Sequence, residues 1–164
     1  MSEIKKFFWL IPLIGATLSL FGLFIPTWYS PPVWVGYWWM IGLIYHVTGG
    51  NVIEFGPLEI SIPSLIAFGL IALSSAIIIL NSIFKSRNKT LWGNPENLWI
   101  KMALIETSAV IFYIISVQIG FFINTSLVFW DRHLIQFGLI TPFIGAGLTL
   151  IGAILEIKLN RTTK

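Results

Sequence analysis

The stretch PSLIAFGLIALSSAIIILNSIF at residues 63–84 decides the class of fold, because it contains no charged side chain. A helix needs about 20 mostly apolar residues to cross a hydrocarbon core that is ~30 Å thick, and this stretch is long enough. The whole chain of 164 residues has the same character, with 56% hydrophobic and 10% charged residues and a mean hydropathy of +0.86. Soluble domains carry roughly 25% charged residues. We therefore expect an integral membrane protein whose main partner is the lipid bilayer.

Three further segments are long and apolar enough to span a membrane. They lie at about residues 7–25, 100–123 and 134–157. The four segments together predict an all-α membrane protein, a four-transmembrane-helix bundle that forms one domain over residues 1–164. The connections are then two loops on one side and one loop on the other, at residues 26–62, 124–133 and 85–99.

The basic residues predict the orientation of these segments. All but one flank the same set of segment ends: Lys5, Lys6, Lys85, Arg87, Lys89, Lys101, Lys158, Arg161 and Lys164. Because Lys and Arg are enriched in cytoplasmic loops, we expect both termini and the 85–99 loop in the cytoplasm, as in a protein of the plasma or cytoplasmic membrane. Residues 25–28 offer no small-residue cleavage site, so we expect the first segment to be retained rather than removed as a signal peptide.

A repeated pattern links the first and fourth segments. Residues 12–22 read PLIGATLSLFG and residues 142–152 read PFIGAGLTLIG. Small residues at helical spacing let membrane helices approach closely. We therefore predict an antiparallel contact between the two segments along this seam, or else two faces that each pack against other helices. The seam residues are Gly15, Ser19, Gly22, Gly145, Thr149 and Gly152.

The first outer loop is rich in aromatic residues and carries a hairpin signal. Around residues 48–51 the sequence Thr-Gly-Gly-Asn is typical of a turn, with β-branched and aromatic residues at 39–47 and 52–62. This pattern predicts a small antiparallel β-sheet in the extracellular loop, with Pro57 in an edge strand or a bulge. A short interfacial helix over residues 36–47 is the alternative. Because Trp and Tyr are enriched at interaction hot spots, we interpret these side chains as a surface for a partner protein: Trp28, Trp34, Tyr37, Trp38 and Trp39.

Glu106 is the one acidic residue well inside a predicted span. An ionisable group within a span is a functional hypothesis by default, because an unpaired buried charge is costly. The structural alternative places Glu106 near the inner interface, paired with Lys85, Arg87 or Lys101. We favour the structural alternative, since no second charge deeper in a span completes a relay.

The sequence carries no recognisable signature for catalysis, a metal or a cofactor. There are no cysteines, so a disulfide and a thiolate metal site are excluded. Five outer residues have side chains that bind metals but lack ligand spacing, so we expect no metal site: His46, Glu54, Glu59, Asp131 and His133. No catalytic motif is present, and no basic stripe for nucleic acid. We expect a non-enzymatic protein without cofactors.

The topology resembles that of the claudin and peripheral-myelin-protein superfamily. In that family the first outer loop forms a small sheet that carries a Trp, then Gly-Leu-Trp, then two cysteines. Here residues 26–28, Pro-Thr-Trp, are similar to the first element and residues 36–38, Gly-Tyr-Trp, to the second, while both cysteines are absent. The resemblance implies a tetraspan that organises the membrane or mediates adhesion, alone or as a homo-oligomer. The alternatives are an accessory subunit of a larger membrane complex and, less favoured, a transporter, channel or membrane enzyme.

Overall fold

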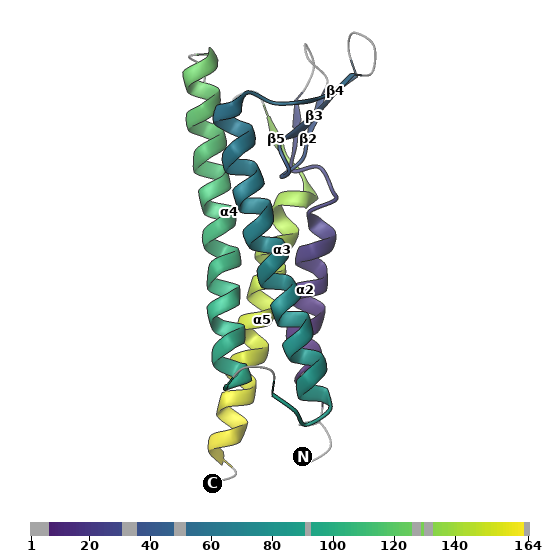
Figure 1. Cartoon of the computed structure of the whole chain (residues 1–164), viewed down its shortest axis with the longest axis vertical. Coiled ribbons are helices and arrows are strands. Elements are labelled where there is room, and N and C mark those ends of the chain that lie inside the picture. The colour runs from purple at the N-terminus through teal and green to yellow at the C-terminus, as the bar shows by residue number, and fades with distance from the viewer. Residues whose placement is uncertain are drawn as a thin grey trace.

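The computed structural model describes residues 7–30, 36–47, 52–90, 93–125, 129 and 133–162. In this part of the chain, helices are packed side by side and a small sheet stands at one end of them (Figure 1). The helices are α2 (Leu10–Gly22), α3 (Leu58–Ser86), α4 (Pro95–Thr125) and α5 (Phe137–Thr162). The strands are β1 (Trp28–Ser30), β2 (Gly36–Trp38), β3 (Leu43–His46), β4 (Val52–Phe55) and β5 (Leu134–Ile135).

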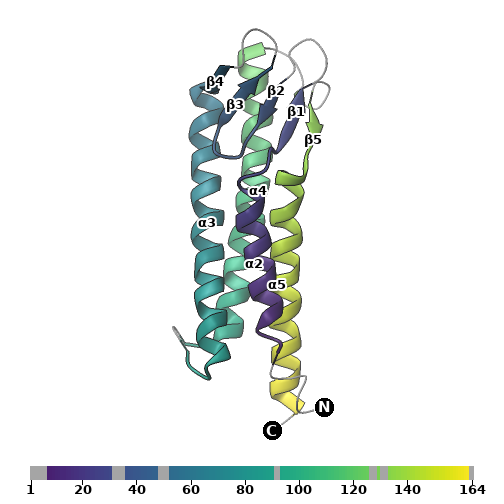
Figure 2. The ribbon, with the colours of Figure 1, turned by 90° about the vertical axis from the view of Figure 1, so that its right-hand side faces the viewer.

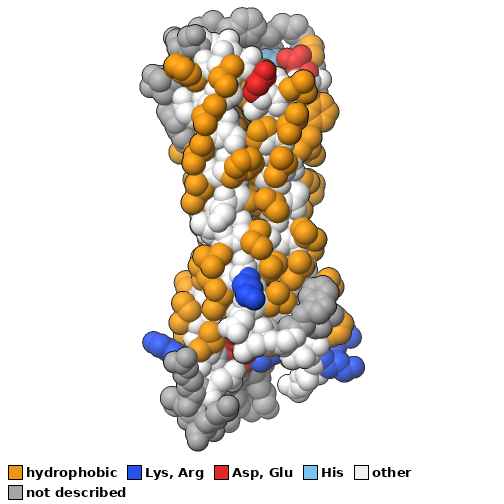
Figure 3. Space-filling view, turned by 60° about the vertical axis from the view of Figure 1, so that its left-hand side comes forward, with side chains coloured by type: hydrophobic (Ala, Val, Ile, Leu, Met, Phe, Trp, Pro, Cys, Tyr) orange, Lys and Arg blue, Asp and Glu red, His pale blue; other side chains and the backbone are white. Residues whose placement is uncertain are grey.

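Three of the described helices, α3, α4 and α5, are long and apolar enough to cross a membrane, so the chain is an integral membrane protein. Hydrophobic side chains cover the flank of the bundle, and Lys and Arg side chains gather toward the end opposite the sheet (Figure 3). We call these two ends the sheet end and the basic end. Helix α2 is shorter, with 13 residues.

The helix ends differ from the predicted spans in both directions. Helix α3 begins at Leu58 and α4 at Pro95, five residues before the predicted starts at 63 and 100. Hydropathy locates the apolar middle of a helix, whereas its ends are set by capping: Asn94 Oδ1 accepts a hydrogen bond from the Glu96 N–H at 3.0 Å. Pro95 then occupies the first turn, where its missing N–H costs nothing.

Helix α2 is shorter than the predicted segment at residues 7–25. Beyond Gly22 the backbone tightens, because the Phe24 N–H bonds the Phe21 carbonyl and the Ile25 N–H bonds the Gly22 carbonyl. Pro26 then follows, and a residue before proline disfavours helical backbone. The apolar side chains therefore continue past the end of the helix.

The predicted hairpin is present, and the helical alternative for residues 36–47 is wrong. Strands β3 and β4 pair antiparallel from Leu43↔Phe55 to His46↔Val52, and the predicted turn at residues 48–51 lies outside the described residues. The prediction for Pro57 is wrong, because it is the residue before α3 and not part of a strand. The second arm ends at Phe55 instead of extending to residue 62.

The sheet also contains a strand that the sequence did not predict. Its strand order is β4-β3-β2-β1-β5, so the two-residue strand β5 pairs with β1. Leu134 and Ile135 had been placed at the start of the fourth span, because two apolar residues before a helix look like part of that helix. The sheet thus joins the two loops of the sheet end into one structure (Figure 2).

The two halves of the repeated pattern lie against each other in the antiparallel contact between α2 and α5. A Cβ atom built on Gly15 would collide with the Gly145 carbonyl oxygen and stand 2.8 Å from Thr149 Oγ1. A Cβ on Gly145 would collide with Ser19 Oγ, and one on Gly152 with the Pro12 ring. The glycines are needed because the two backbones touch directly.

Candidate functional site

Side chains of the sheet alternate between its two faces, as the pleat of a strand requires. Trp28 lies opposite Trp38, and Trp38 opposite Ile44, in the register of β1, β2 and β3. Trp28 and Ile44 are buried, and Trp38 is half-buried. This row faces the helices and forms part of the core.

Trp28 is therefore a core residue, and its prediction as a partner-binding residue is wrong. Its exposed fraction is 0%, and its Nε1–H donates to the Tyr113 hydroxyl of α4 at 3.0 Å. The hydroxyl of Thr27 lies 2.8 Å from the same oxygen and donates to the Trp38 carbonyl. A Trp that is buried with a satisfied N–H anchors the sheet to the bundle. Trp34 lies outside the described residues.

An aromatic cluster beside the sheet contains Phe129 and His133 from the second outer loop. The ring of His133 stacks on Phe129 with 3.8 Å between centroids, and Trp38 and Phe121 meet it edge-on. The Nδ1 atom of His133 lies 3.0 Å from the Phe129 carbonyl oxygen, which makes this nitrogen the N–H donor. Burial lowers the pKa of His133, and the hydrogen bond to Phe129 acts in the opposite direction.

We expect the sheet end to lose stability on acidification because of His133. The unfolded chain binds a proton near the ordinary His pKa of 6.5, whereas the folded chain resists it, so protonation favours unfolding. The stabilisation is present above about pH 6.5 and is lost as the pH falls through the lowered pKa of the folded state. Thermal unfolding in detergent between about pH 7.5 and pH 5 measures this slope. His133→Gln should flatten this slope; an equal slope in His133→Gln and in the unmodified chain would contradict the prediction.

The opposite face of the sheet carries a row of tyrosines. Tyr29, Tyr37 and Tyr45 lie directly across from one another on β1, β2 and β3. The rings of Tyr29 and Tyr37 are 5.2 Å apart, and the ring of Trp39 lies 6.4 Å from that of Tyr37. All are half-buried. We call Tyr29, Tyr37 and Tyr45 the tyrosine row.

The contact residues predicted from the sequence include Tyr37 but leave out Tyr29 and Tyr45. The signal that separates outward from inward side chains is the period of two in each strand. Tyr29 follows the inward Trp28, and Tyr45 follows the inward Ile44, so both point away from the helices. Of the predicted contact residues, Tyr37 belongs to the outward row, and Trp38 belongs to the inward row.

Strand β4 closes one edge of the sheet, and all four of its residues are exposed. Ile53 is 67% exposed and lies across from Tyr45, so it extends the outward row to the edge. Glu54 pairs with His46 at 3.0 Å. An exposed apolar edge strand is a ready template for pairing with another chain.

Glu106 lies in the core of the helix bundle. Its exposed fraction is 0%, and its carboxyl group accepts hydrogen bonds from Ser75 Oγ of α3 at 2.5 Å and from Ser19 Oγ of α2 at 3.1 Å. We call Glu106, Ser19 and Ser75 the Glu106 layer. It stands between two apolar clusters, one including Val110 toward the sheet end and one including Trp99 toward the basic end.

The predicted pairing of Glu106 with a basic residue at the inner interface is wrong. Because α4 begins at Pro95, Glu106 lies roughly 16 Å along the helix from its start, too deep for that contact. Lys85 instead pairs with Glu96 and with Glu156, each at 3.1 Å. Among the described residues, no salt bridge includes Glu106.

The placement of Glu106 is explained by helical spacing. Buried residues of α4 recur at intervals of three and four, which puts them on one face: Trp99, Ala103, Glu106, Val110, Tyr113 and Val117. Read with this period, the sequence places Glu106 among core residues. A carboxyl group without a cationic partner in such a site is favoured in its neutral form, since burying the charge costs far more than burying the acid. The acid O–H then donates to one of the two serine hydroxyls, and the other hydroxyl donates to the carbonyl oxygen of the acid.

The outer metal-binding side chains do not converge on one site. His46 contacts Glu54 at the sheet edge, whereas His133 lies in the aromatic cluster. Glu59 lies near the start of α3, 3.5 Å from Asn124 Nδ2. Asp131 lies outside the described residues. Within the described ranges, no group of three acidic or His side chains is placed to hold a metal ion.

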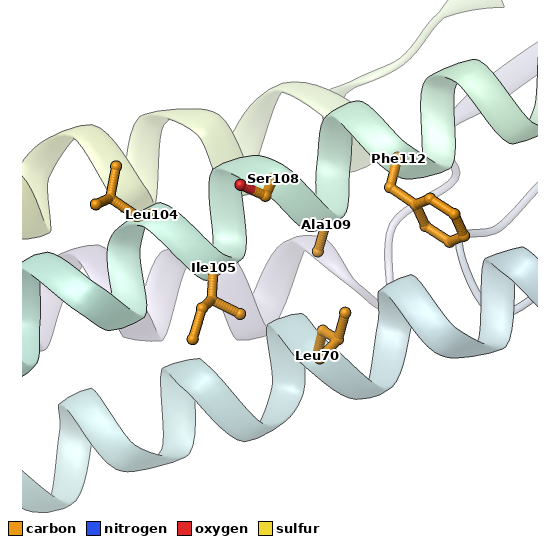
Figure 4. A pocket seen from close by; sticks show the side chains of 6 residues that line it. All are labelled: Leu70, Leu104, Ile105, Ser108, Ala109 and Phe112. Carbon is orange, nitrogen blue, oxygen red and sulfur yellow. The ribbon is translucent and has the colours of Figure 1, made fainter.

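A groove on the flank of the bundle runs between α3 and α4. It has a volume of about 450 Å³, and apart from Ser108 its lining is apolar (Figure 4). It lies on the side of α4 away from Glu106, since Leu104 and Phe112 are exposed. Lipid chains in the surrounding membrane have access to such a groove. The lining residues are Leu70, Leu104, Ile105, Ser108, Ala109 and Phe112.

Comparison with known proteins assigns no family. No protein-family model matches the chain, and no curated protein matches its sequence.

Proposed function

We propose that this chain is a non-enzymatic four-span membrane protein, similar in design to the claudin superfamily, that contacts a partner protein through the tyrosine row. The partner is recognised by aromatic contact on the outward face of the sheet. The row carries this proposal because three tyrosines align on one face while Trp28 and Trp38 fill the other. Tyr gives a large contact area with little loss of side-chain freedom, and its hydroxyl offers a hydrogen bond.

The proposal of four spans rests on the position of α2. The start of α2 and the end of α5 lie at the basic end in Figure 1, whereas β1, which follows α2, lies at the sheet end. The 13 residues of α2 cover about 20 Å. Turns at residues 7–9 and 23–25 extend this length at both ends. We take α2 with these turns as the fourth crossing.

The proposed orientation puts the sheet end outside and the basic end in the cytoplasm of a plasma or cytoplasmic membrane. Lys85 lies in the last turn of α3, and Arg87 and Lys89 follow directly after it. Lys158 lies near the end of α5. The positive-inside rule is the reason for this assignment.

The proposed likeness to claudins is supported by the pairing of its two sequence elements. Trp28 and Trp38 lie directly opposite each other in β1 and β2. The cysteines of that family are absent here. The bond from Trp28 to Tyr113 and the pairing of β5 with β1 hold the sheet in place without a disulfide.

A photoreactive amino acid at position 37 tests the proposed contact. We expect Tyr37→p-benzoylphenylalanine, irradiated in native membranes, to give one discrete cross-linked species. Changing Tyr29 and Tyr45 to Ser should weaken that species, because the contact surface is shared. Phe112→p-benzoylphenylalanine, in the α3–α4 groove, is the control. A discrete product at position 112 with none at position 37 would contradict the proposal and favour an accessory subunit buried through its helices.

A further inference from the structure

A second hollow lies where α2 meets the sheet. It has a volume of about 300 Å³, at the lower end of the range of about 300–1,000 Å³ for small-molecule sites. Its lining is apolar and comes from four parts of the chain. These are Leu23 and Phe24 after α2, Trp39, Ile41 and Leu43 in β3 and the turn before it, Ile53 of β4 and Phe68 of α3.

The early end of α2 creates this hollow. The last carbonyls of a helix have no partner within it, and in an apolar setting each needs one. Trp39 Nε1–H donates to the Phe24 carbonyl oxygen at 3.2 Å. This bond satisfies both polar groups, so the indole ring can line the hollow with its apolar surface.

The hollow lies within one hydrocarbon thickness of the basic end. Phe68 precedes Lys85 of the basic end by roughly 26 Å along α3, which is within the ~30 Å of a hydrocarbon core. The hollow is open to the lipid-facing surface, since Phe24 is 74% exposed and Ile53 is 67% exposed. On α3 the exposed Leu65 continues the same apolar surface from Phe68.

We propose that this hollow binds one acyl chain of a membrane lipid, taken from the leaflet on the sheet side. The chain enters from the lipid-facing surface beside Phe24 and lies against Trp39 and the outward side chains of β3 and β4, Leu43 and Ile53. Trp39, Leu43 and Ile53 bound the hollow on the side of the sheet, and its small volume suits the end of one flexible chain rather than a helix. The bound lipid ties the position of the sheet to the bilayer beside the tyrosine row, because Ile53 lies across from Tyr45 and Trp39 lies next to Tyr37.

A phospholipid with a diazirine in its acyl chain tests this site in reconstituted vesicles. After irradiation, the labelled residues are mapped by mass spectrometry. We expect strong labelling around Leu23 and Phe68, which Leu43→Trp should reduce severalfold by filling the hollow. Labelling around Leu104 in the α3–α4 groove should stay unchanged, because that groove is separate.

Two further variants keep the test decisive. Leu104→Trp fills the other groove and should leave labelling around Phe68 unchanged. Ile41→Phe narrows the hollow with a smaller change and replaces Leu43→Trp if that variant does not fold by circular dichroism and gel filtration. Equal labelling around Phe68 in the unmodified chain and in a folded filled variant would overturn the proposal, as would labelling no stronger there than around Leu104.

Discussion

Replacing Gly145 by Leu is expected to prevent the native packing of α2 on α5. Any Cβ at this position collides with the Gly15 carbonyl oxygen, a backbone atom that no rotamer change can move, and with Ser19 Oγ. The two helices must then separate along the seam. Overpacking in a well-packed core costs typically 1–3 kcal/mol, and we expect about 3 kcal/mol or more here because backbone meets backbone.

Gly147 supplies the matched control for this variant. It lies on the same helix two residues away, and a Cβ built there has no atom within 4 Å. Both variants are unfolded with a denaturing detergent, and the loss of helix is followed by circular dichroism. We expect Gly147→Leu to unfold at the same detergent concentration as the unmodified chain. An equal loss of stability in both variants would show that the effect comes from placing Leu anywhere in this helix and not from the contact between α2 and α5.

The second large effect is expected at Glu106. Glu106→Ala leaves the hydroxyls of Ser19 and Ser75 buried without their partner, which costs about 1–3 kcal/mol for each such group. The cavity left by the shorter side chain adds to this loss. Glu106→Gln keeps the size and the hydrogen-bonding groups without a charge. If the native group is the neutral acid, we expect the free energy of unfolding of the Gln variant to lie within about 1 kcal/mol of that of the unmodified chain.

Two controls separate this reading from its alternatives. Ser75→Ala should cost about 1–3 kcal/mol, whereas Ser108→Ala on the exposed face of the same bundle should cost almost nothing. Infrared spectroscopy should show a protonated carboxyl band that is absent from Glu106→Gln. If Gln destabilises the chain as much as Ala does, the site needs an ionised carboxylate and our interpretation of Glu106 as the neutral acid is wrong.

Much of the helical fold could be predicted from the sequence because lipid simplifies the pattern. An uncharged run as long as residues 63–84 predicts a membrane-spanning helix, because a helix satisfies its own backbone hydrogen bonds in lipid. Small side chains recur at matching positions in residues 12–22 and 142–152. Because small side chains let membrane helices approach closely, they predicted the contact between the first and last helices. The ends of the helices escaped prediction, because capping by Asn94 and the stop before Pro26 depend on local hydrogen bonds rather than on hydropathy.

The sites were predicted less well, for reasons that lie in individual residues. Trp28 was read as a surface residue because loop aromatics often are, whereas its partner Tyr113 lies far away in the sequence. Glu106 was placed at the interface because the start of α4 was set too late. Strand β5 consists of two apolar residues whose pairing with β1 is visible only in three dimensions.

Single-cysteine labelling tests the central claim, that α2 crosses the membrane and separates the basic end from the sheet. The chain has no cysteine, so each introduced thiol is unique. Ser2→Cys ahead of α2, Glu54→Cys in β4 and Lys89→Cys after α3 are exposed to a membrane-impermeant maleimide on intact cells. We predict that Glu54→Cys is labelled at once, and that Ser2→Cys and Lys89→Cys react only after permeabilisation. Labelling of Ser2→Cys on intact cells as readily as Glu54→Cys would contradict the four-span account.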